Sequence, residues 1–397
     1  MADNKDKKVL NVPALRFPEF TGEWERHKLS EVCSFYSGGT PSSSKKEYYN
    51  GNIPFIRSGE LHKDYTELFI TEAGLSNSAA KLVETGDLLL ALYGATSGDI
   101  AISKIKGAIN QAILCIRTKQ NKKFIESVWN KHVERLLQTY LQGGQGNLSA
   151  DIVKNIPFYF ANSNEQDKLA KFISLLDERI ATQNKIIEKY ESLIQAIIYK
   201  EKMDGISKGT WQRIALCKVL QERNEKNVNG RTICSVSVSQ GVVNQVEYLG
   251  RSFAAKQTSH YNIVKYGDIV YTKSPTGNFP YGIIKRSNIR EDVAVSPLYG
   301  VYIPASDSIG VFLHFYFMQP SNAFNYLHPL IQKGAKNTIN ITNGRFLENS
   351  VLLPISKSEA NTIAGILKTI QAKIEIEKNL LQLYTKEKEY LLRQMFI

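Results

Sequence analysis

Few residues of this 397-residue chain are arranged for catalysis. Methylation of a base amino group needs an Asn/Asp-Pro-Pro-Tyr/Phe tetrad, which Asn155-Ile156-Pro157-Phe158 matches only in part. A metal-dependent nuclease needs clustered carboxylates beside a lysine, but Asp-x-Lys occurs only in the polar segment Asp3–Lys8. The six histidines are scattered singly, and no Walker-type phosphate-binding loop is present. We therefore expect no catalytic, cofactor-binding or metal-binding residues in this chain.

Polar loops are better suited than any of these residues to contact nucleic acid. Lys and Arg supply affinity by contacting phosphates, and side chains that reach base edges supply specificity. The net charge of +12 fits a negatively charged partner, although charge alone does not separate DNA from RNA or an acidic membrane. In the N-terminal half the predicted DNA-binding residues are Thr40, Ser42, Ser43, Lys45, Arg57, Ser58, Tyr93, Thr96, Ser97, Gln142, Gln145 and Asn147. In the C-terminal half they are Lys256, Tyr271, Lys273, Thr276, Asn278, Lys333, Lys336 and Asn337.

Each of these segments also has a simpler interpretation. Gly38–Lys46 could be a plain surface turn, and Arg57 could pair with Glu60 instead of guanine. The loop at 142–147 is the most suggestive, because its glycines admit close approach of the backbone and Gln and Asn match adenine. Its alternative is an ordinary loop before the next strand.

The segments that carry these loops occur twice, with a period of about 190 residues. The first repeat opens at Trp24 and the second at Trp211. In each, a Gly-Asp turn, at 86–87 and 267–268, leads into an apolar strand. Each repeat then closes with a long helix, and the helices are the more similar parts. The repetition predicts two related globular domains that present their loops on the same face.

Both helices carry apolar residues in alternating steps of four and three, which is typical of a coiled-coil seam. The seam of the first contains Leu169, Ile173, Leu176, Ile180, Gln183 and Ile187. The seam of the second contains Ile363, Leu367, Ile370, Ile374, Glu377 and Leu381. Gln183 and Glu377 occupy matching positions, so an antiparallel, in-register pair would bring these polar residues together and help to fix the register.

The helix ends give the expected domain boundaries. Ser163 or Asn164 is expected to cap the first helix and Ser356 or Ser358 the second, and the first should end near Gly205. The predicted fold class is α+β, with two mixed α/β domains, two long antiparallel coiled-coil helices and a pseudo-two-fold internal repeat. The expected segments are a polar tail at 1–20, a domain at 21–162, a helix at 163–204, a domain at 205–355 and a helix at 356–397.

This order of features resembles the specificity subunit of type I restriction–modification systems. The segments that carry the resemblance are Tyr36–Ser42 (YSGGTPS), Gly86–Leu90 with the following Tyr93–Ala95, and the helix start Glu165–Ala170. The resemblance extends from about Trp24 to Phe396. The second repeat departs from it, because it has no Gly-Gly-Thr-Pro-Ser segment and carries the charged stretch Gln221–Lys226 instead.

The resemblance implies that each globular domain is a target-recognition domain that reads one half of a bipartite, asymmetric sequence in double-stranded DNA. The helices would set the spacer and dock two methyltransferase subunits that methylate adenine at N6. Outer apolar residues available for that docking are Phe172, Ile186, Leu193 and Ile198, and their alternative role is to widen the core stripe of the helices. Restriction subunits that translocate DNA would join through them. S-adenosylmethionine, ATP and Mg would be held by those partners, and this chain would hold no cofactor.

Two other functions are compatible with the sequence. A coiled-coil scaffold whose globular ends bind proteins would show no steep salt dependence of DNA binding. A self-sufficient DNA-modifying enzyme with no recognisable motif would methylate or cleave DNA alone. The N-terminus has no signal-peptide pattern, no apolar stretch reaches membrane-spanning length, and the four cysteines form no Cys-x-x-Cys pair. We expect a cytoplasmic protein without a membrane partner.

Overall fold

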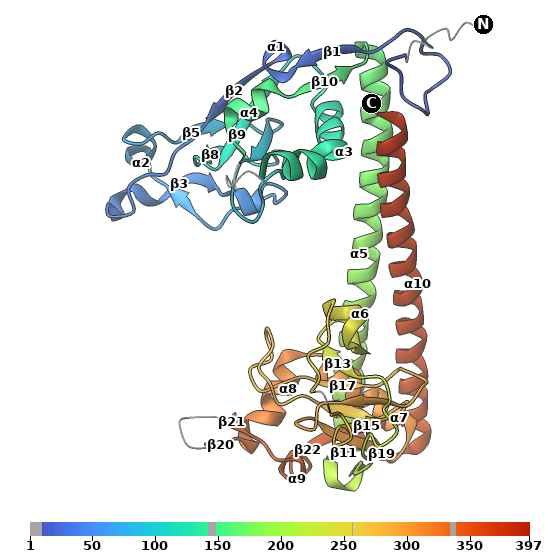
Figure 1. Ribbon diagram of the computed structural model, residues 1–397. Helices are drawn as coiled ribbons and strands as arrows, with labels where there is room; N and C mark the ends of the chain where they lie inside the picture. The colour runs from blue at the N-terminus through green and yellow to red at the C-terminus, as the bar shows by residue number, and fades with distance from the viewer. Residues whose placement is uncertain (1–9, 142–147, 256, 334–338) are drawn as a thin grey trace, which may run out of the picture. The chain divides into compact units, whose positions relative to one another are not determined.

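Figure 1 shows the computed structural model, which describes residues 10–141, 148–255, 257–333 and 339–397. The chain forms two compact units, the first of residues 1–183 and 380–397 and the second of residues 184–379. Each unit contains one β-rich domain together with part of the long helices α5 (Ser163–Lys208) and α10 (Lys357–Met395).

The first domain contains two four-stranded sheets. One has the antiparallel order β2 (Cys33–Ser37), β9 (Ile113–Thr118), β6 (Leu88–Ala91), β7 (Ile100–Ile102). The other has the order β4 (Phe69–Ile70), β3 (Tyr49–Ile56), β8 (Gly107–Ile109), β5 (Lys81–Val83), in which β3 and β8 run parallel. A further pair joins β1 (Glu25–Lys28) to β10 (Pro157–Phe160). The helices are α1 (Leu29–Val32), α2 (Glu72–Ser76), α3 (Lys122–Leu141) and α4 (Ala150–Asn155).

The second domain repeats the first of these sheets. Its four antiparallel strands have the order β12 (Leu220–Glu222), β19 (Gly300–Pro304), β16 (Ile269–Tyr271), β17 (Ile284–Arg286). The paired strands around it are β11 (Trp211–Ala215) with β22 (Ser350–Pro354), β13 (Cys234–Ser237) with β14 (Gly241–Asn244), β15 (Asn262–Val264) with β18 (Val293–Val295), and β20 (Gln332–Lys333) with β21 (Ile339–Asn340). Its helices are α6 (Gln245–Leu249), α7 (Asp307–Phe317), α8 (Pro320–Leu327) and α9 (Asn343–Phe346).

The two domains therefore share one plan. In both, the central strand follows the Gly-Asp turn, and a helix packs against the edge strand, α3 on β7 and α7 on β17. The predicted fold class, with its internal repeat and its long antiparallel helices, is confirmed.

Strand β6 explains why its sequence is an unbroken apolar run. Leu88 and Leu90 pack into one hydrophobic cluster and Leu89 and Ala91 into another, and all four are fully buried. Because alternate side chains of a strand point to opposite faces, both faces of this sheet are covered. A strand buried on both sides shows no polar alternation.

The predicted cap of the first long helix was wrong by one residue. Asn162 precedes α5, and its side-chain Oδ1 accepts a hydrogen bond from the Glu165 N–H (3.0 Å). At α10, Ser356 rather than Ser358 is the capping residue, with Oγ 3.4 Å from the Glu359 N–H. Asn and Ser are both favoured caps, so residue type alone did not separate the neighbouring candidates at 162–164.

The expected stop at Gly205 was also wrong, because α5 continues to Lys208 and Gly209 follows with φ +68°. Gly205 has another role. A Cβ atom at this position would lie 1.9 Å from the indole Cδ1 of Trp211. The glycine therefore lets the Trp211 ring pack directly on the helix backbone, a requirement that helix-termination rules do not reveal.

The two helices pack along the seam. Every predicted seam residue on α5 and α10 is buried or half-buried, and Gln183 is only 2% exposed. Within the first unit, Asp177 pairs with Lys388 (2.5 Å) and Arg179 donates to the Tyr384 hydroxyl (2.8 Å). As residue numbers rise on α5 they fall on α10, which makes the pair antiparallel.

Each domain is also tied to the helices by an ion pair, and the two pairs have opposite polarity. In the first unit Lys123, in the opening turn of α3, contacts Asp177 of α5 (2.6 Å). In the second unit Asp307, which opens α7, pairs with Lys368 of α10. The domain helix thus contributes the positive charge in the first unit and the negative charge in the second. Each of these residues therefore matches the long helix of its own unit and not that of the other.

The Lys123–Asp177 pair should couple the first domain to the helix measurably. Both side chains are largely buried, at 20% and 31% exposure. We expect the Lys123→Ala and Asp177→Ala changes to show a coupling energy of about 1 kcal/mol in a double-mutant cycle measured by urea unfolding. Purely additive effects would show that the contact does not hold the domain. Lys378→Ala, which removes an exposed pair with Glu191 (3.4 Å), is the control and should cost little.

Candidate nucleic-acid interface

Each domain forms the same hydrogen-bonded turn before its central strand. Asp87 Oδ2 accepts a hydrogen bond from the backbone N–H of Glu84 (3.0 Å), and Asp268 Oδ2 accepts one from Lys265 (2.8 Å). The glycine before each aspartate has a positive φ, +89° in the first domain and +91° in the second, which favours glycine. These Gly-Asp pairs therefore shape the turn from which the loop-bearing central strand begins.

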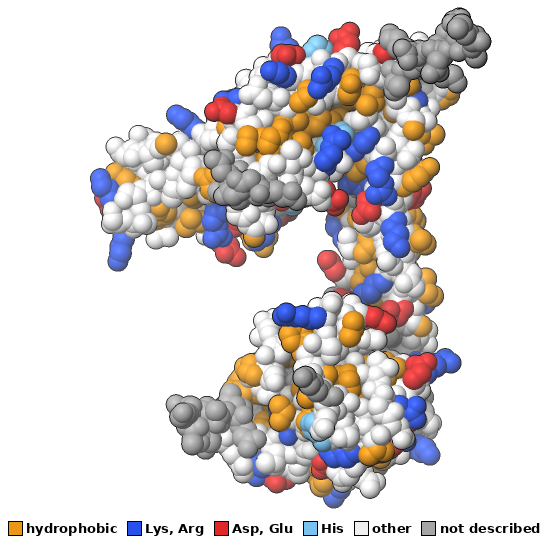
Figure 2. Space-filling view, viewed as in Figure 1, with side chains coloured by type: hydrophobic (Ala, Val, Ile, Leu, Met, Phe, Trp, Pro, Cys, Tyr) orange, Lys and Arg blue, Asp and Glu red, His pale blue; other side chains and the backbone are white. Residues whose placement is uncertain are grey.

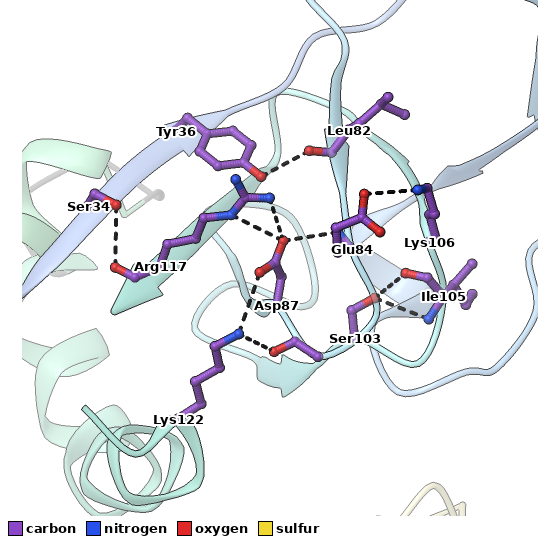
Figure 3. Close-up of polar contacts among 11 residues, drawn as sticks. Ser34, Tyr36, Leu82, Glu84, Asp87, Ser103, Ile105, Lys106, Arg117 and Lys122 are labelled. Atoms are coloured by element: carbon purple, nitrogen blue, oxygen red, sulfur yellow. Dashed lines mark hydrogen bonds and ion pairs between the residues drawn. The ribbon is translucent and has the colours of Figure 1, made fainter. Parts of the chain in front are cut away.

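An arginine binds the turn aspartate in each domain, but the two arginines come from different places in the sheet. Arg117 of β9 donates through Nη2 to Asp87 Oδ2 (2.9 Å), as Figure 3 shows. Arg223, directly after β12, binds Asp268 with two hydrogen bonds of 2.6 and 3.0 Å. In strand order β12 corresponds to β2, whereas Arg117 lies in β9. The arginine that binds the aspartate therefore comes from neighbouring strand positions in the two domains.

The Asp87 carboxylate contacts two positively charged side chains, those of Arg117 and Lys122 (Figure 3). Burial alone would raise the pKa of Asp87, but the Arg117 hydrogen bond, the Glu84 N–H and the charges of Arg117 and Lys122 outweigh burial and lower the pKa. The Arg117 guanidinium also lies over the Tyr36 ring, 5.1 Å from its centroid, while its side chain stays 47% exposed. Arg117 is thus held in one place with part of its surface open to solvent.

The Gly-Gly-Thr-Pro segment lies against β8. A Cβ on Gly38 would lie 1.8 Å from the Ile109 carbonyl oxygen, and one on Gly39 would lie 2.5 Å from the Ala79 Cβ. Glycine is needed at both positions because the backbones touch. Thr40 follows this contact and is itself exposed, and its hydroxyl donates a hydrogen bond to the Gln111 side chain (2.6 Å).

Four predicted residues share the exposed loop that follows. Thr40, Ser42, Ser43 and Lys45 are all exposed. Ser42 exchanges a hydrogen bond with the Ser44 hydroxyl (2.8 Å), and Lys45 donates to the Tyr48 hydroxyl (3.0 Å). Their polar groups are open to solvent, as DNA contact requires, while contact with bases or phosphates stays a prediction.

Arg57 forms an ion pair with Glu60, which is the simpler of the two interpretations of its sequence. Its Nη2 lies 2.8 Å from Glu60 Oε1, and its Nε lies 3.3 Å from the other carboxylate oxygen. Burial would raise the pKa of Glu60, but the bonds from Arg57 and Thr66 outweigh it and lower the pKa. Arg57 remains 48% exposed and the adjacent Ser58 is half-buried. Binding to guanine would therefore compete with an existing pair.

The loop after β6 is more enclosed than its sequence suggested. Tyr93 is half-buried and packs against the core of the first unit, and Thr96 and Ser97 are half-buried. The Ser97 hydroxyl donates to the Leu92 carbonyl (2.9 Å). These side chains mainly close the turn and present only part of their surface.

Tyr271 is the clearest correction in the second domain. It is 1% exposed, stacks on Phe346 with ring centroids 4.8 Å apart, and donates its hydroxyl to the Tyr281 carbonyl (2.8 Å). A side chain so enclosed has no surface to offer DNA, and it is a core residue. Beyond it, Lys273 is half-buried with φ +62°, whereas Thr276 and Asn278 are exposed.

The remaining predicted contacts lie outside the described residues. They are Gln142, Gln145, Asn147, Lys256, Lys336 and Asn337. The backbone of Lys333 belongs to β20, but its side chain is not described.

Sequence reasoning missed the two arginines that close the turns. The separations of Arg117 from Asp87 and of Arg223 from Asp268 differ, so no repeated spacing pointed to them. It also placed Ile198 on the outer helix face, whereas this residue is 2% exposed and Leu193 is 44% exposed.

The described part of the chain offers no grouping of three His, Cys, Asp or Glu side chains that could hold a metal ion. Burial raises the pKa of Cys115 and of Cys234 to about 11, which leaves both thiols protonated and unreactive at neutral pH. Within the same described ranges, no helix is both apolar and long enough to cross a membrane.

Comparisons with known proteins agree on one family. The model of the type I restriction modification DNA specificity domain matches residues 21–192. The specificity subunit of the Escherichia coli enzyme EcoR124I/EcoR124II is 27% identical over 174 residues, which cover 41% of this chain and 43% of that subunit. The MjaVIII specificity subunit of Methanocaldococcus jannaschii is 21% identical over 410 residues, covering 94% of this chain and 91% of its own length.

Solved structures show the same fold. The S subunit of a type I restriction-modification system from M. genitalium has a TM-score of 0.59 at 14% identity, covering 97% of this chain and 99% of that one. A chain from a study of complex assembly and conformational transition in a type I system has a TM-score of 0.51 at 12% identity, covering 94% and 97%.

Proposed function

We propose that this chain is a specificity subunit of the type I restriction–modification kind, as its similarity to the specificity-domain model and to such subunits supports, and that it selects the DNA sequence on which such a complex acts. Each globular domain reads one half of a bipartite, asymmetric target in double-stranded DNA. The chain supplies recognition and leaves catalysis to its partners. S-adenosylmethionine, ATP and Mg are bound by those partners.

The repeated four-stranded sheet carries this proposal. The order β2-β9-β6-β7 recurs as β12-β19-β16-β17, and each central strand ends in a polar loop. One scaffold thus presents two loop sets of different sequence, Tyr93–Gly98 in the first domain and Lys273–Asn278 in the second. Different side chains on matching scaffolds favour two different half-sites.

The helices set the spacer and dock two methyltransferase subunits that methylate adenine at N6, with restriction subunits joining through them. Exposed hydrophobic side chains on their outer surface support this part (Figure 2). They are Leu175, Leu193, Tyr199, Met203 and Ile206 on α5, and Ile366, Ile376, Leu383 and Tyr390 on α10. Apolar surface of this kind marks protein-binding sites when it is contiguous.

Salt dependence separates this function from that of a protein-binding scaffold. A DNA reader that contacts Z phosphates loses affinity with a log–log slope of about −0.9Z. We would titrate duplexes from a randomised pool into the chain bound to its methyltransferase partner, at several salt concentrations. Steep salt dependence with enrichment of one bipartite sequence supports the proposal. Salt-independent binding or no enrichment would support the scaffold function.

The loop at 142–147 should act on one half-site only. Replacing Gln145 and Asn147 by alanine is expected to relax or change the first half-site and to leave the second unaltered. Loss of one base contact of this type costs about 1–3 kcal/mol. The selected sequences of the variant and of the wild-type complex would be compared. Loss of both half-sites from a folded variant would contradict the assignment, and Thr276→Ala provides a matched change in the second domain.

A further inference from the structure

A cavity of about 840 Å³ lies within the second unit, where the domain meets α5 and α10. Its inner wall includes Lys285 of β17 and His314 of α7, and the β13–β14 hairpin contributes residues 238–241. The helices supply Ile194, Gln195 and several carboxylates to the other side. Most of the side chains that line it are polar or charged, and apolar ones such as Ile194 and Ile374 are the minority, so the cavity suits a polar ligand.

Lys285 is the unusual member of this wall. The residue is only 3% exposed, and its side chain has no hydrogen bond or ion pair among the described residues. Burial lowers the pKa of Lys285 to about 8, so the ammonium form still predominates at neutral pH. A buried charge without a partner is costly. The ammonium group therefore borders the cavity without a neutralising anion.

The internal repeat shows that the fold does not need this lysine. Lys285 pairs across the sheet with Val270, and the corresponding partner of Leu89 in the first domain is Ala101. Ala101 is equally buried, at 3% exposure. An apolar residue thus satisfies the same strand position, and the lysine has been added in the second domain alone.

A second polar group of the cavity also lacks a partner. Gln195 Oε1, which lines it, is buried and has no hydrogen-bond partner among the described residues. The Nδ1 atom of His314 accepts a hydrogen bond from the Arg286 N–H (3.1 Å). Burial, with the charges of Lys285 and Arg286, lowers the pKa of His314 to about 3. The neutral ring therefore carries its proton on Nε2, which makes Nε2–H a donor.

We propose that this cavity binds a small molecule with one anionic group, a carboxylate or a monophosphate. The anionic group pairs with the Lys285 ammonium and accepts a hydrogen bond from His314 Nε2–H. The outer side carries the exposed carboxylates of Glu188, Glu191 and Glu375, and Glu191 pairs there with Lys378 (3.4 Å). The carboxylates that Lys378 does not neutralise favour an amine or hydroxyl group at the other end of the ligand and repel polyanions such as DNA.

The test uses the full chain and calorimetric titration with three probes: inorganic phosphate, acetate and glycine. Phosphate and acetate distinguish the two anionic groups, and glycine adds the amine that the carboxylates would accept. The variant Lys285→Ala copies the residue of the first domain. It should fold at least as stably as the wild type, because it removes an unpaired buried charge. Lys189→Ala, an exposed lysine of α5 outside the cavity lining, is the control.

We expect saturable binding of at least one probe by the wild type and by Lys189→Ala, and binding at least about tenfold weaker by Lys285→Ala. Absence of saturable binding for all three probes would overturn the proposal. Equal binding by folded Lys285→Ala would also overturn it, since that result would show an adventitious ion only.

Discussion

Replacing Asp268 by alanine is expected to destabilise the second unit by about 3–5 kcal/mol. The carboxylate is 2% exposed and is bound by Arg223 at 2.6 and 3.0 Å, and the Arg223 side chain is only 14% exposed. Its removal leaves a guanidinium in a poorly hydrated place. The change also removes the acceptor of the Lys265 N–H, which forms the turn. Urea unfolding and hydrogen exchange over β16 would measure the loss.

Asp87→Ala is the matched control, because the first domain has the same turn with a more exposed arginine. The Arg117 side chain is 47% exposed, so water can hydrate its charge when the carboxylate is lost. We expect a cost of about 1–2 kcal/mol, mainly from the broken turn. Equal losses in both domains would contradict the view that burial of the arginine decides the size of the effect.

Trp211→Ala should have an effect of similar size, about 3–5 kcal/mol. The indole is 6% exposed, packs edge-on against Phe312 with centroids 5.4 Å apart, and covers Gly205 of α5. Its Nε1–H donates to Glu359 Oε1 at the start of α10 (2.6 Å). Removal of the ring would open a cavity between the domain and the helices, visible as faster hydrogen exchange in β11 and α7.

Trp211→Phe separates the two contributions of this residue. Phenylalanine keeps most of the packing on Gly205 but cannot donate to Glu359. We expect a smaller cost than for alanine, about 1–3 kcal/mol, from a carboxylate that loses its hydrogen bond. If phenylalanine and alanine destabilised the chain equally, ring packing would not be the main contribution. The other two tryptophans, Trp24 and Trp129, lie in the first unit and provide a fluorescence check that this unit stays folded.

The parts of the fold that follow from local periodicity were predictable from the sequence. The seam of α5 and α10 depends on a repeat of four- and three-residue steps, and the turns depend on a Gly-Asp pair before an apolar strand. Features that depend on distant residues were not predictable. Gly205 stays in the helix because Trp211 packs on it, and Asp268 is closed by an arginine from another strand.

The candidate contacts were predictable only as loops and not as side-chain positions. The segment Thr40–Lys45 lies at the surface, as a polar composition suggests. Tyr271 was also predicted to face DNA because it borders a polar loop. It is instead the last residue of a buried strand, and its ring stacks on Phe346 from a distant part of the sequence. Polar composition identifies a loop, whereas packing decides which of its side chains face solvent.

The most direct test of the proposed function is a genome-wide map of N6-methyladenine in cells that co-express this chain with its methyltransferase partner. Cells with the partner alone provide the control. We predict one new bipartite motif with a fixed gap and two different halves, absent from the control. A stable complex with the partner that produces no new methylated motif would contradict the assignment of sequence recognition to this chain.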